Sequence, residues 1–104
     1  MTYARQAIDA LSDPTRRDIL EKLRRGPRAV GEIAADLPIS RPAVSQHLKL
    51  LKESGLVAER RQGTRHYFAL APDGLGEIRA YVDGLWDDAL AAFAAHVAKR
   101  PADE

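Results

Sequence analysis

The sequence contains no cysteine, and this absence excludes several classes of protein. A chain without thiols has no disulfide framework, no thiolate metal site and no thiol redox switch. Long apolar runs are also missing, since none approaches the roughly 20 residues that a membrane-spanning helix needs. The N-terminus lacks the apolar stretch of a secretory signal peptide. These absences predict a cytoplasmic protein with no membrane segment.

Net charge is also small, but the charges are distributed unevenly along the chain. The 104 residues predict a single domain over residues 1–104, and they carry 16 Lys and Arg against 15 Asp and Glu. Residues 1–71 have a net charge of +5, and residues 72–104 have a net charge of −4. A polyanion would therefore meet the first two thirds of the chain, although chance scatter of surface charge gives the same pattern.

Capping residues and apolar spacing predict three short helices in the first part of the chain. Residues 3–11 alternate apolar and polar side chains with helical spacing. Asp13 and Pro14 fit the N-cap and the first position of a second helix, which Gly26 ends. A third helix is expected over residues 29–38.

A fourth helix is expected after Ser40, which fits the N-cap position, and it ends at Gly55. Its apolar residues recur at i, i+4 and i+7, which predicts a buried stripe of Val44, Leu48 and Leu51. The opposite side of the helix carries Pro42, Ser45, Gln46 and Lys49. This polar arc is either ordinary solvated surface or a surface that recognises a partner.

The pattern then changes from helical spacing to alternation, which is typical of β-strands. The tripeptide QGT places a glycine at the centre of a turn, so residues 57–71 are expected to form a β-hairpin. The tip of this hairpin is basic and contains Arg60, Arg61, Arg65 and His66.

The last helix is expected over residues 72–97, and at 1.5 Å per residue it is roughly 35 to 40 Å long. It carries two lines of apolar side chains, Leu75, Ile78, Val82 and Leu85 in one and Trp86, Leu90, Phe93 and Val97 in the other. The first line could pack against the core of the same chain. The second line, with Ile8 and Leu11 of the first helix, would stay exposed in a monomer, which predicts a homodimer.

These elements together predict a mainly helical fold with a β-hairpin wing, which is a winged helix-turn-helix. The helix-turn-helix core would occupy residues 14–55 and the wing residues 57–71. The dimerisation helices would be residues 3–11 and 72–97. Such a fold predicts a sequence-specific protein that binds double-stranded DNA.

The fourth helix has the size to enter the major groove of DNA, which is about 12 Å wide. Arg41, Ser45 and Gln46 carry donors and acceptors that suit base edges. Lys49 and the wing arginines suit phosphates, and free N–H groups at the start of the helix would add a phosphate contact. The polar arc of the fourth helix is therefore interpreted as a DNA-reading surface.

Three motifs, DPTRRDIL, SRPAVSQHLKLLKESGLV and RRQGTRHYFAL, resemble those of the ArsR family of bacterial winged helix-turn-helix repressors. The resemblance implies a homodimer joined through the first and last helices, which binds a palindromic operator and represses its own or a neighbouring operon. It implies DNA contacts by Arg41, Pro42, Ser45, Gln46, Lys49, Arg61 and Arg65. The dimer contacts are expected at Ile8, Leu11, Val82, Trp86, Leu90 and Phe93.

The sequence departs from the metal-sensing members of that family. Their CVC motif falls on Ala29, Val30 and Gly31, so both thiolates are missing. In the last helix Asp83 and His96 match the family's metal-site pattern, but Leu85 and Lys99 fill its other two places. Half a set of ligands does not close a coordination shell. We therefore expect the metal-independent type, with no metal or cofactor and with an unknown signal such as a small-molecule inducer.

Three alternatives follow from other features of the sequence. One is a metal-responsive repressor with an atypical site in the last helix, and another is a winged-helix module that binds proteins. An enzyme would need a nucleophile or an acid–base pair in a cleft. The acidic pair Asp87 and Asp88 fits a solvated helix face, and Ser12 with Asp13 fits a helix cap, so we expect no enzymatic activity.

Overall fold

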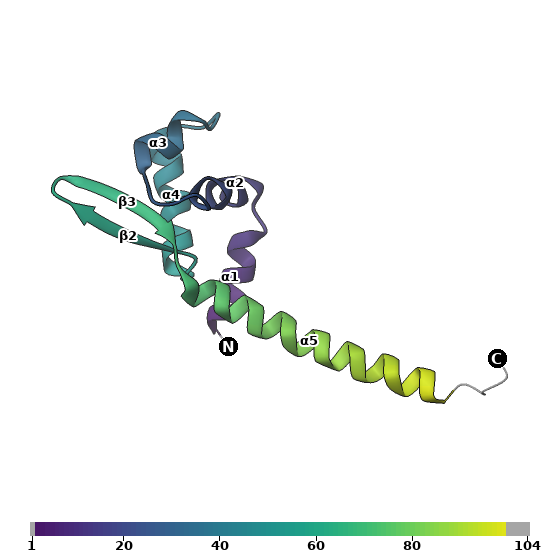
Figure 1. The fold of residues 1–104 in the computed structure, drawn as a ribbon. Coiled ribbons are helices and arrows are strands. Elements are labelled where there is room, and N and C mark those ends of the chain that lie inside the picture. Colours follow the sequence, from purple (N-terminus) through teal and green to yellow (C-terminus); the bar gives the residue numbers. More distant parts are fainter. Residues whose placement is uncertain (1, 100–104) are drawn as a thin grey trace.

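The computed structural model describes residues 2–99, with side chains from Ala4 onward. The expected domain also took in residue 1 and residues 100–104, which lie outside the described part. Eight elements follow one another (Figure 1): α1 (Thr2–Leu11), α2 (Pro14–Leu23), β1 (Arg28–Ala29), α3 (Val30–Ala35), α4 (Arg41–Glu53), β2 (Val57–Gln62), β3 (Arg65–Leu70) and α5 (Pro72–Ala98).

The predicted fold class is confirmed: helices α2 to α4 form a helix-turn-helix core, and β2 and β3 form its wing. Helix α4 lies at the centre, the wing projects to one side of it, and α5 leaves in the opposite direction (Figure 1). The largest buried side chains come from α2, α3, α4 and the residue before β2, and they are Ile19, Leu23, Ile33, Val44, Leu48, Leu51 and Leu56. Burial of this apolar surface is the main force that holds the helices together.

The helix caps lie where the sequence predicts them. The carboxylate of Asp13 accepts hydrogen bonds from the backbone N–H groups of Thr15 at 2.8 Å and Arg16 at 3.1 Å. The hydroxyl of Ser40 accepts one from the N–H of Ala43 at 3.2 Å. Each cap satisfies backbone donors that the first turn of a helix leaves without an intrahelical partner. The caps therefore fix the start of α2 and of α4.

Helix α3 is shorter than the predicted helix over residues 29–38, since it ends at Ala35 and since an additional strand precedes its start. Arg28 and Ala29 form β1, which pairs antiparallel with Phe68 and Tyr67 of β3. The three strands have the order β1-β3-β2. The backbone of Ala29 is therefore extended and precedes α3 instead of lying within it. A strand of two residues is too short to produce an alternating pattern that the sequence could reveal.

Helix α5 begins in direct contact with the end of α4. The N–H of Gly74 donates a hydrogen bond to the carbonyl of Gly55 at 2.7 Å. A Cβ atom added to Gly74 would overlap the carbonyl oxygen of Ser54, closer than real Cβ contacts are found. Gly55 itself has a φ of +75°, a left-handed conformation that favours glycine. Two glycines thus allow the backbones of the two helices to meet.

Most of α5 extends away from the core, which corrects one expectation. Ile78 packs against the core, but Val82 and Leu85 of the same line are 52% and 54% exposed. The second line is exposed as expected, with Trp86 at 62% and Phe93 at 67%. Beyond Ile78 the side chains of both lines are about half exposed or more, and the molecule measures 69 × 25 × 23 Å.

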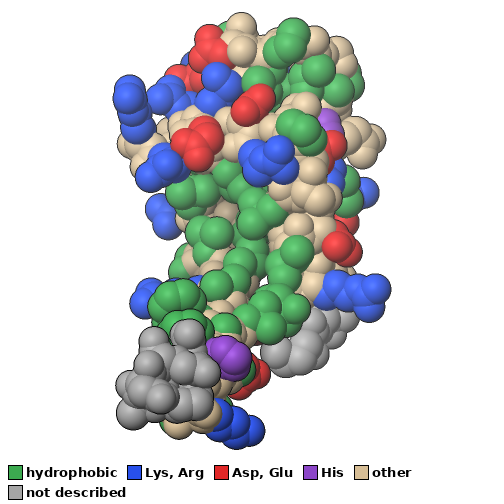
Figure 2. Space-filling view, turned by 90° about the vertical axis from the view of Figure 1, so that its right-hand side faces the viewer, with side chains coloured by type: hydrophobic (Ala, Val, Ile, Leu, Met, Phe, Trp, Pro, Cys, Tyr) green, Lys and Arg blue, Asp and Glu red, His purple; other side chains and the backbone are tan. Residues whose placement is uncertain are grey.

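The exposed apolar side chains form a continuous area on one side of the molecule. Figure 2 shows hydrophobic side chains over the centre of its middle and lower parts, whereas charged side chains are most frequent in the upper part and along the edges. Helix α1 packs along α5 at this surface, and Ile8 of α1 is 37% exposed. Within residues 2–99, none of the helices combines the length and the apolar character that crossing a membrane requires.

Candidate nucleic-acid interface

Helix α4 presents two different faces. Val44, Leu48 and Leu51 are at most 1% exposed and pack into the core. The predicted DNA-reading positions of this helix are all exposed, and they are Arg41, Pro42, Ser45, Gln46 and Lys49. An α-helix with side chains is about 10–12 Å across, and the major groove of DNA is about 12 Å wide. The structure thus brings five polar or small side chains onto a face that a groove can admit.

The backbone at the start of α4 offers fewer free donors than we predicted. Pro42 has no N–H group, and the N–H of Ala43 already donates to the hydroxyl of Ser40. The N–H of Val44 donates to the carbonyl of Ser40 at 3.0 Å within the helix. The side chains of α4 therefore matter more for an anionic partner than its backbone does.

Arg41 lies against the neighbouring helix of the helix-turn-helix. A Cβ atom added to Gly31 of α3 would lie 3.6 Å from Nη1 of Arg41, at ordinary van der Waals distance. The guanidinium group therefore rests beside α3, where a small residue leaves room for it. Spacing along the chain does not indicate this contact, because it joins two residues on different helices.

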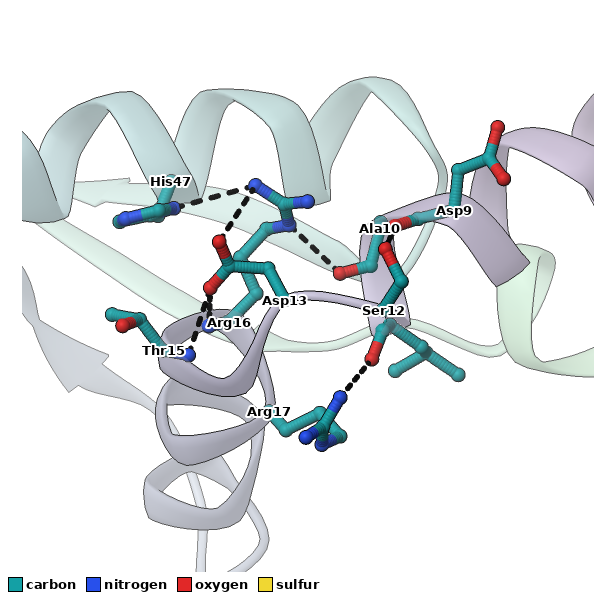
Figure 3. A network of polar contacts seen from close by, with 9 residues as sticks. Asp9, Ala10, Ser12, Asp13, Thr15, Arg16, Arg17 and His47 are labelled. Carbon is teal, nitrogen blue, oxygen red and sulfur yellow. Dashed lines mark hydrogen bonds and ion pairs between the residues drawn. The ribbon is translucent and has the colours of Figure 1, made fainter.

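Helix α4 is also tied to the turn between α1 and α2 by Arg16, which comes from the DPTRRDIL motif (Figure 3). Its Nε donates a hydrogen bond to the carbonyl of Ala10 at 2.7 Å, and its Nη1 lies 3.5 Å from Nδ1 of His47. Arg17 donates to the carbonyl of Leu11 at 2.7 Å. Two arginines therefore satisfy carbonyl groups at the end of α1. His47 is half-buried at the edge of the core, at the border of the buried stripe of α4.

The wing has a tight turn at Gly63, whose φ is +62°. Arg61 pairs with His66 across the two strands, and Gln62 pairs with Arg65. Because successive side chains of a strand point to opposite faces, Arg61 and Arg65 lie on opposite faces of the wing. Both are exposed, as is Arg60, which shares a face with Arg65. The two residues predicted to contact DNA from the wing, Arg61 and Arg65, thus lie one on each face of the hairpin.

His66 was predicted as part of the basic tip, but the structure places it in an ion-pair cluster closer to α4. Nδ1 of His66 contacts one carboxylate oxygen of Glu59, and Nζ of Lys52 donates to the other at 2.9 Å. These two contacts, that of Lys52 first, lower the pKa of Glu59 below its ordinary value. We did not predict this cluster. The one feature of the sequence that could have indicated it is Glu59, because this charged residue shares a strand face with Val57, which is buried.

The residues expected at a dimer interface and at a metal site lie on other parts of the molecule. Leu11 packs partly against the core, whereas Val82, Trp86, Leu90 and Phe93 are about half exposed or more. On α5, the carboxylate of Asp83 lies 3.8 Å from Nε of Arg79. Among the described residues no group of three or more His, Asp or Glu side chains could hold a metal ion.

Comparison with known sequences gives matches over most of the chain. Residues 13–59 match the family model described as bacterial regulatory protein, arsR family. The HTH-type transcriptional regulator Rv2034 of Mycobacterium tuberculosis is 54% identical over 89 residues, which are 86% of this chain and 83% of that protein. The transcriptional repressor SdpR of Bacillus subtilis is 43% identical over 61 residues, which are 59% and 68% of the two chains.

Comparison with solved structures also finds regulators of the ArsR type. An ArsR-like transcriptional regulator from Rhodococcus sp. RHA1 has a TM-score of 0.73 and 30% identity, and the match covers 88% of this chain and 90% of that one. The homodimeric winged helix-turn-helix DNA-binding domain Mb0332 from Mycobacterium bovis has a TM-score of 0.67 and 33% identity, covering 84% and 81%. These similar proteins are transcriptional regulators rather than enzymes.

Proposed function

The chain belongs to the arsR family of bacterial regulatory proteins. We therefore propose that it is a DNA-binding transcriptional repressor. The polar, exposed face of α4 beside a basic wing is the observation that carries the proposal. Arg41, Ser45 and Gln46 would contact base edges in the major groove, with Pro42 against the groove wall. Lys49, Arg61 and Arg65 would contact phosphates. The operon it represses would be its own or a neighbouring one.

We further propose that it acts as a homodimer on a palindromic operator. The apolar surface of α1 and α5 would meet the same surface of a second copy across a two-fold axis, with contacts by Ile8, Leu11, Val82, Trp86, Leu90 and Phe93. Soluble monomers rarely expose so continuous an apolar area. A two-fold protein requires two half-sites of opposite orientation, and their centres would lie about 34–36 Å apart, or a multiple of that distance.

We propose that the repressor does not use a metal to sense its signal. Ala29, Val30 and Gly31 carry no donor side chains at the place of the family's CVC motif. On α5, Asp83 lies beside Arg79, and His96 is exposed. A zinc titration tests this point. Stoichiometric zinc should leave the affinity for DNA unchanged, and a zinc effect that disappears in His96→Ala would support the metal-responsive alternative.

Footprinting on the DNA upstream of its own gene tests the function as a whole. We expect protection of a site with two-fold symmetry, and binding to that site should be at least about 10³-fold tighter than to random DNA. Both affinities are compared at the same salt concentration, because the electrostatic part of DNA affinity depends strongly on salt. Equal affinity for every DNA, or no binding at micromolar protein, would contradict the proposal and favour a protein-interaction module.

A further inference from the structure

We propose that Glu59 is a positioning residue, which holds the wing at a fixed place beside α4, the proposed recognition helix, and thereby sets the wing's contribution to DNA affinity. This inference rests on the proposed DNA-binding function of the same surface. Its starting point is the juxtaposition of three elements: Lys52 lies on α4, Glu59 on β2 and His66 on β3. A single carboxylate joins all three.

The contacts of Glu59 use both of its carboxylate oxygens. Oε1 accepts a hydrogen bond from Nζ of Lys52 at 2.9 Å, and Oε2 contacts Nδ1 of His66. The Glu59 side chain is 24% exposed, compared with 54% for Lys52 and 40% for His66. Hydrogen bonds in which a partner is charged are shorter and stronger than those between neutral groups. Glu59 is thus the least exposed member of the cluster and the partner that the other two share.

The surroundings of Glu59 place it at the DNA-facing side of the molecule. A groove of about 320 Å³ lies between α4 and the wing, and Ser45 and Lys49 of the proposed reading face line it together with Glu59. Cross-strand pairing puts Arg61 next to His66 on the same face of the wing. A change in the position of the wing would therefore move proposed phosphate contacts relative to proposed base contacts.

A direct DNA contact would give Glu59 the opposite effect on affinity. A carboxylate near phosphates repels them, so its removal should strengthen binding if electrostatics alone decided the outcome. A positioning carboxylate strengthens binding despite its charge, because it keeps the cationic wing in place. The sign of the change in Glu59→Gln therefore separates positioning from simple repulsion of phosphates. This variant removes the charge and keeps the shape of the side chain.

The experiment measures operator affinity and wing mobility in the full-length protein. Glu59→Gln should weaken operator binding by about two- to fivefold, the range expected when a partly exposed ion-pair network is removed. Glu21→Gln is the matched control, because Glu21 of α2 forms an exposed ion pair with Arg24, the residue after that helix, at 3.2 Å. This control also removes one negative charge, and it should leave affinity unchanged or slightly stronger.

The same substitution in a variant without the wing arginines tests whether Glu59 acts through the wing. In a chain that carries Arg61→Ala and Arg65→Ala, Glu59→Gln should cause no further decrease in affinity. ¹⁵N relaxation of the Gly63 and Thr64 amides in the free protein should show a more mobile wing in Glu59→Gln than in wild type. Lys52→Met, which removes the contact from the α4 side, should increase wing mobility in the same way. Thermal melting confirms that each variant is folded.

Three results would overturn the proposal: stronger operator binding by Glu59→Gln, a decrease in affinity that persists without the wing arginines, or unchanged wing mobility. A wild-type protein that binds no DNA would instead contradict the proposed function. In that case the relaxation measurement on the free protein still decides whether Glu59 holds the wing. The two proposals can therefore fail independently.

Discussion

Gln46 lies on the exposed face of α4, between Ser45 and the half-buried His47. Its amide can donate and accept hydrogen bonds at a base edge, whereas an alanine can do neither. We expect Gln46→Ala to reduce the preference for the operator over random DNA by about 1–3 kcal/mol. Competition binding on both DNAs measures this ratio. Gln6→Ala on the exposed side of α1 is the control and should leave it unchanged.

Asp13 predicts a pH dependence of stability. The hydrogen bond from the N–H of Arg16 is the main cause that lowers the pKa of the Asp13 carboxyl below its ordinary value of 3.8. The folded chain therefore keeps this group ionised at lower pH than the unfolded chain does. Its contribution to the free energy of unfolding is present above pH 3.8 and disappears as the pH falls through the folded-state value.

Asp13→Asn tests this dependence by chemical denaturation at several pH values. The variant should be less stable than wild type at neutral pH, and the difference should shrink as the pH falls below 3.8. Asp18→Asn, at an exposed position of the same helix, reports the effect of removing a charge without removing the cap. A difference between wild type and Asp13→Asn that stays constant with pH would show that the cap does not depend on the charge.

At the scale of elements, the meeting of α4 and α5 depends on the absence of a side chain at Gly74. Gly74→Ala would place a methyl group against the backbone of Ser54 and Gly55, and such overpacking costs about 1–3 kcal/mol or more. Gly76→Ala is the control, and it should change the stability in the opposite direction. A Cβ there meets nothing within 4 Å, and alanine favours a helix over glycine by roughly 0.8–1 kcal/mol.

Denaturant unfolding of the two glycine variants decides the point. We expect Gly74→Ala to be clearly less stable than wild type and Gly76→Ala to be slightly more stable. Equal stability of the two variants would mean that α5 can shift away from α4 without cost.

The wing and the recognition helix should contribute different kinds of affinity. Arg65 is exposed on the hairpin, where it donates a hydrogen bond to the hydroxyl of Tyr67 at 3.2 Å. We expect Arg65→Ala to weaken operator and random DNA alike. The slope of log K against log salt should flatten by about 0.9 for each phosphate that the protein no longer neutralises. Binding curves at several salt concentrations measure the slope, and an effect confined to the operator would assign Arg65 to base reading instead.

At the scale of the whole molecule, the long α5 predicts the state of assembly. Its apolar residues face solvent along most of its length, so a second copy should cover them. Sedimentation at micromolar concentration should give twice the mass of one chain. Leu90→Asp should shift the protein towards the monomer, whereas Gln62→Asp on the wing adds the same charge and should not. A wild-type protein that sediments as a single chain would contradict the dimer.

Features that depend on neighbouring residues could be predicted from the sequence. The caps Asp13 and Ser40, the glycine turn at Gly63 and the apolar spacing of α4 all follow from residues that are close together in the sequence. The exposure of the polar face of α4 follows as well, because helical spacing alone places these side chains opposite the stripe. The helix-turn-helix and its wing were therefore predictable.

Features that join distant residues were decided by the tertiary structure. Strand β1 exists because Arg28 and Ala29 meet β3, about 40 residues later, and two residues carry no periodicity of their own. Glu59 meets His66 across the hairpin, but it meets Lys52 only when the wing packs beside α4. Helix α5 leaves the core at the point where Gly74 meets Gly55 at the end of α4. Local geometry fixes each element, but the angles at which the elements pack depend on side chains from several of them at once.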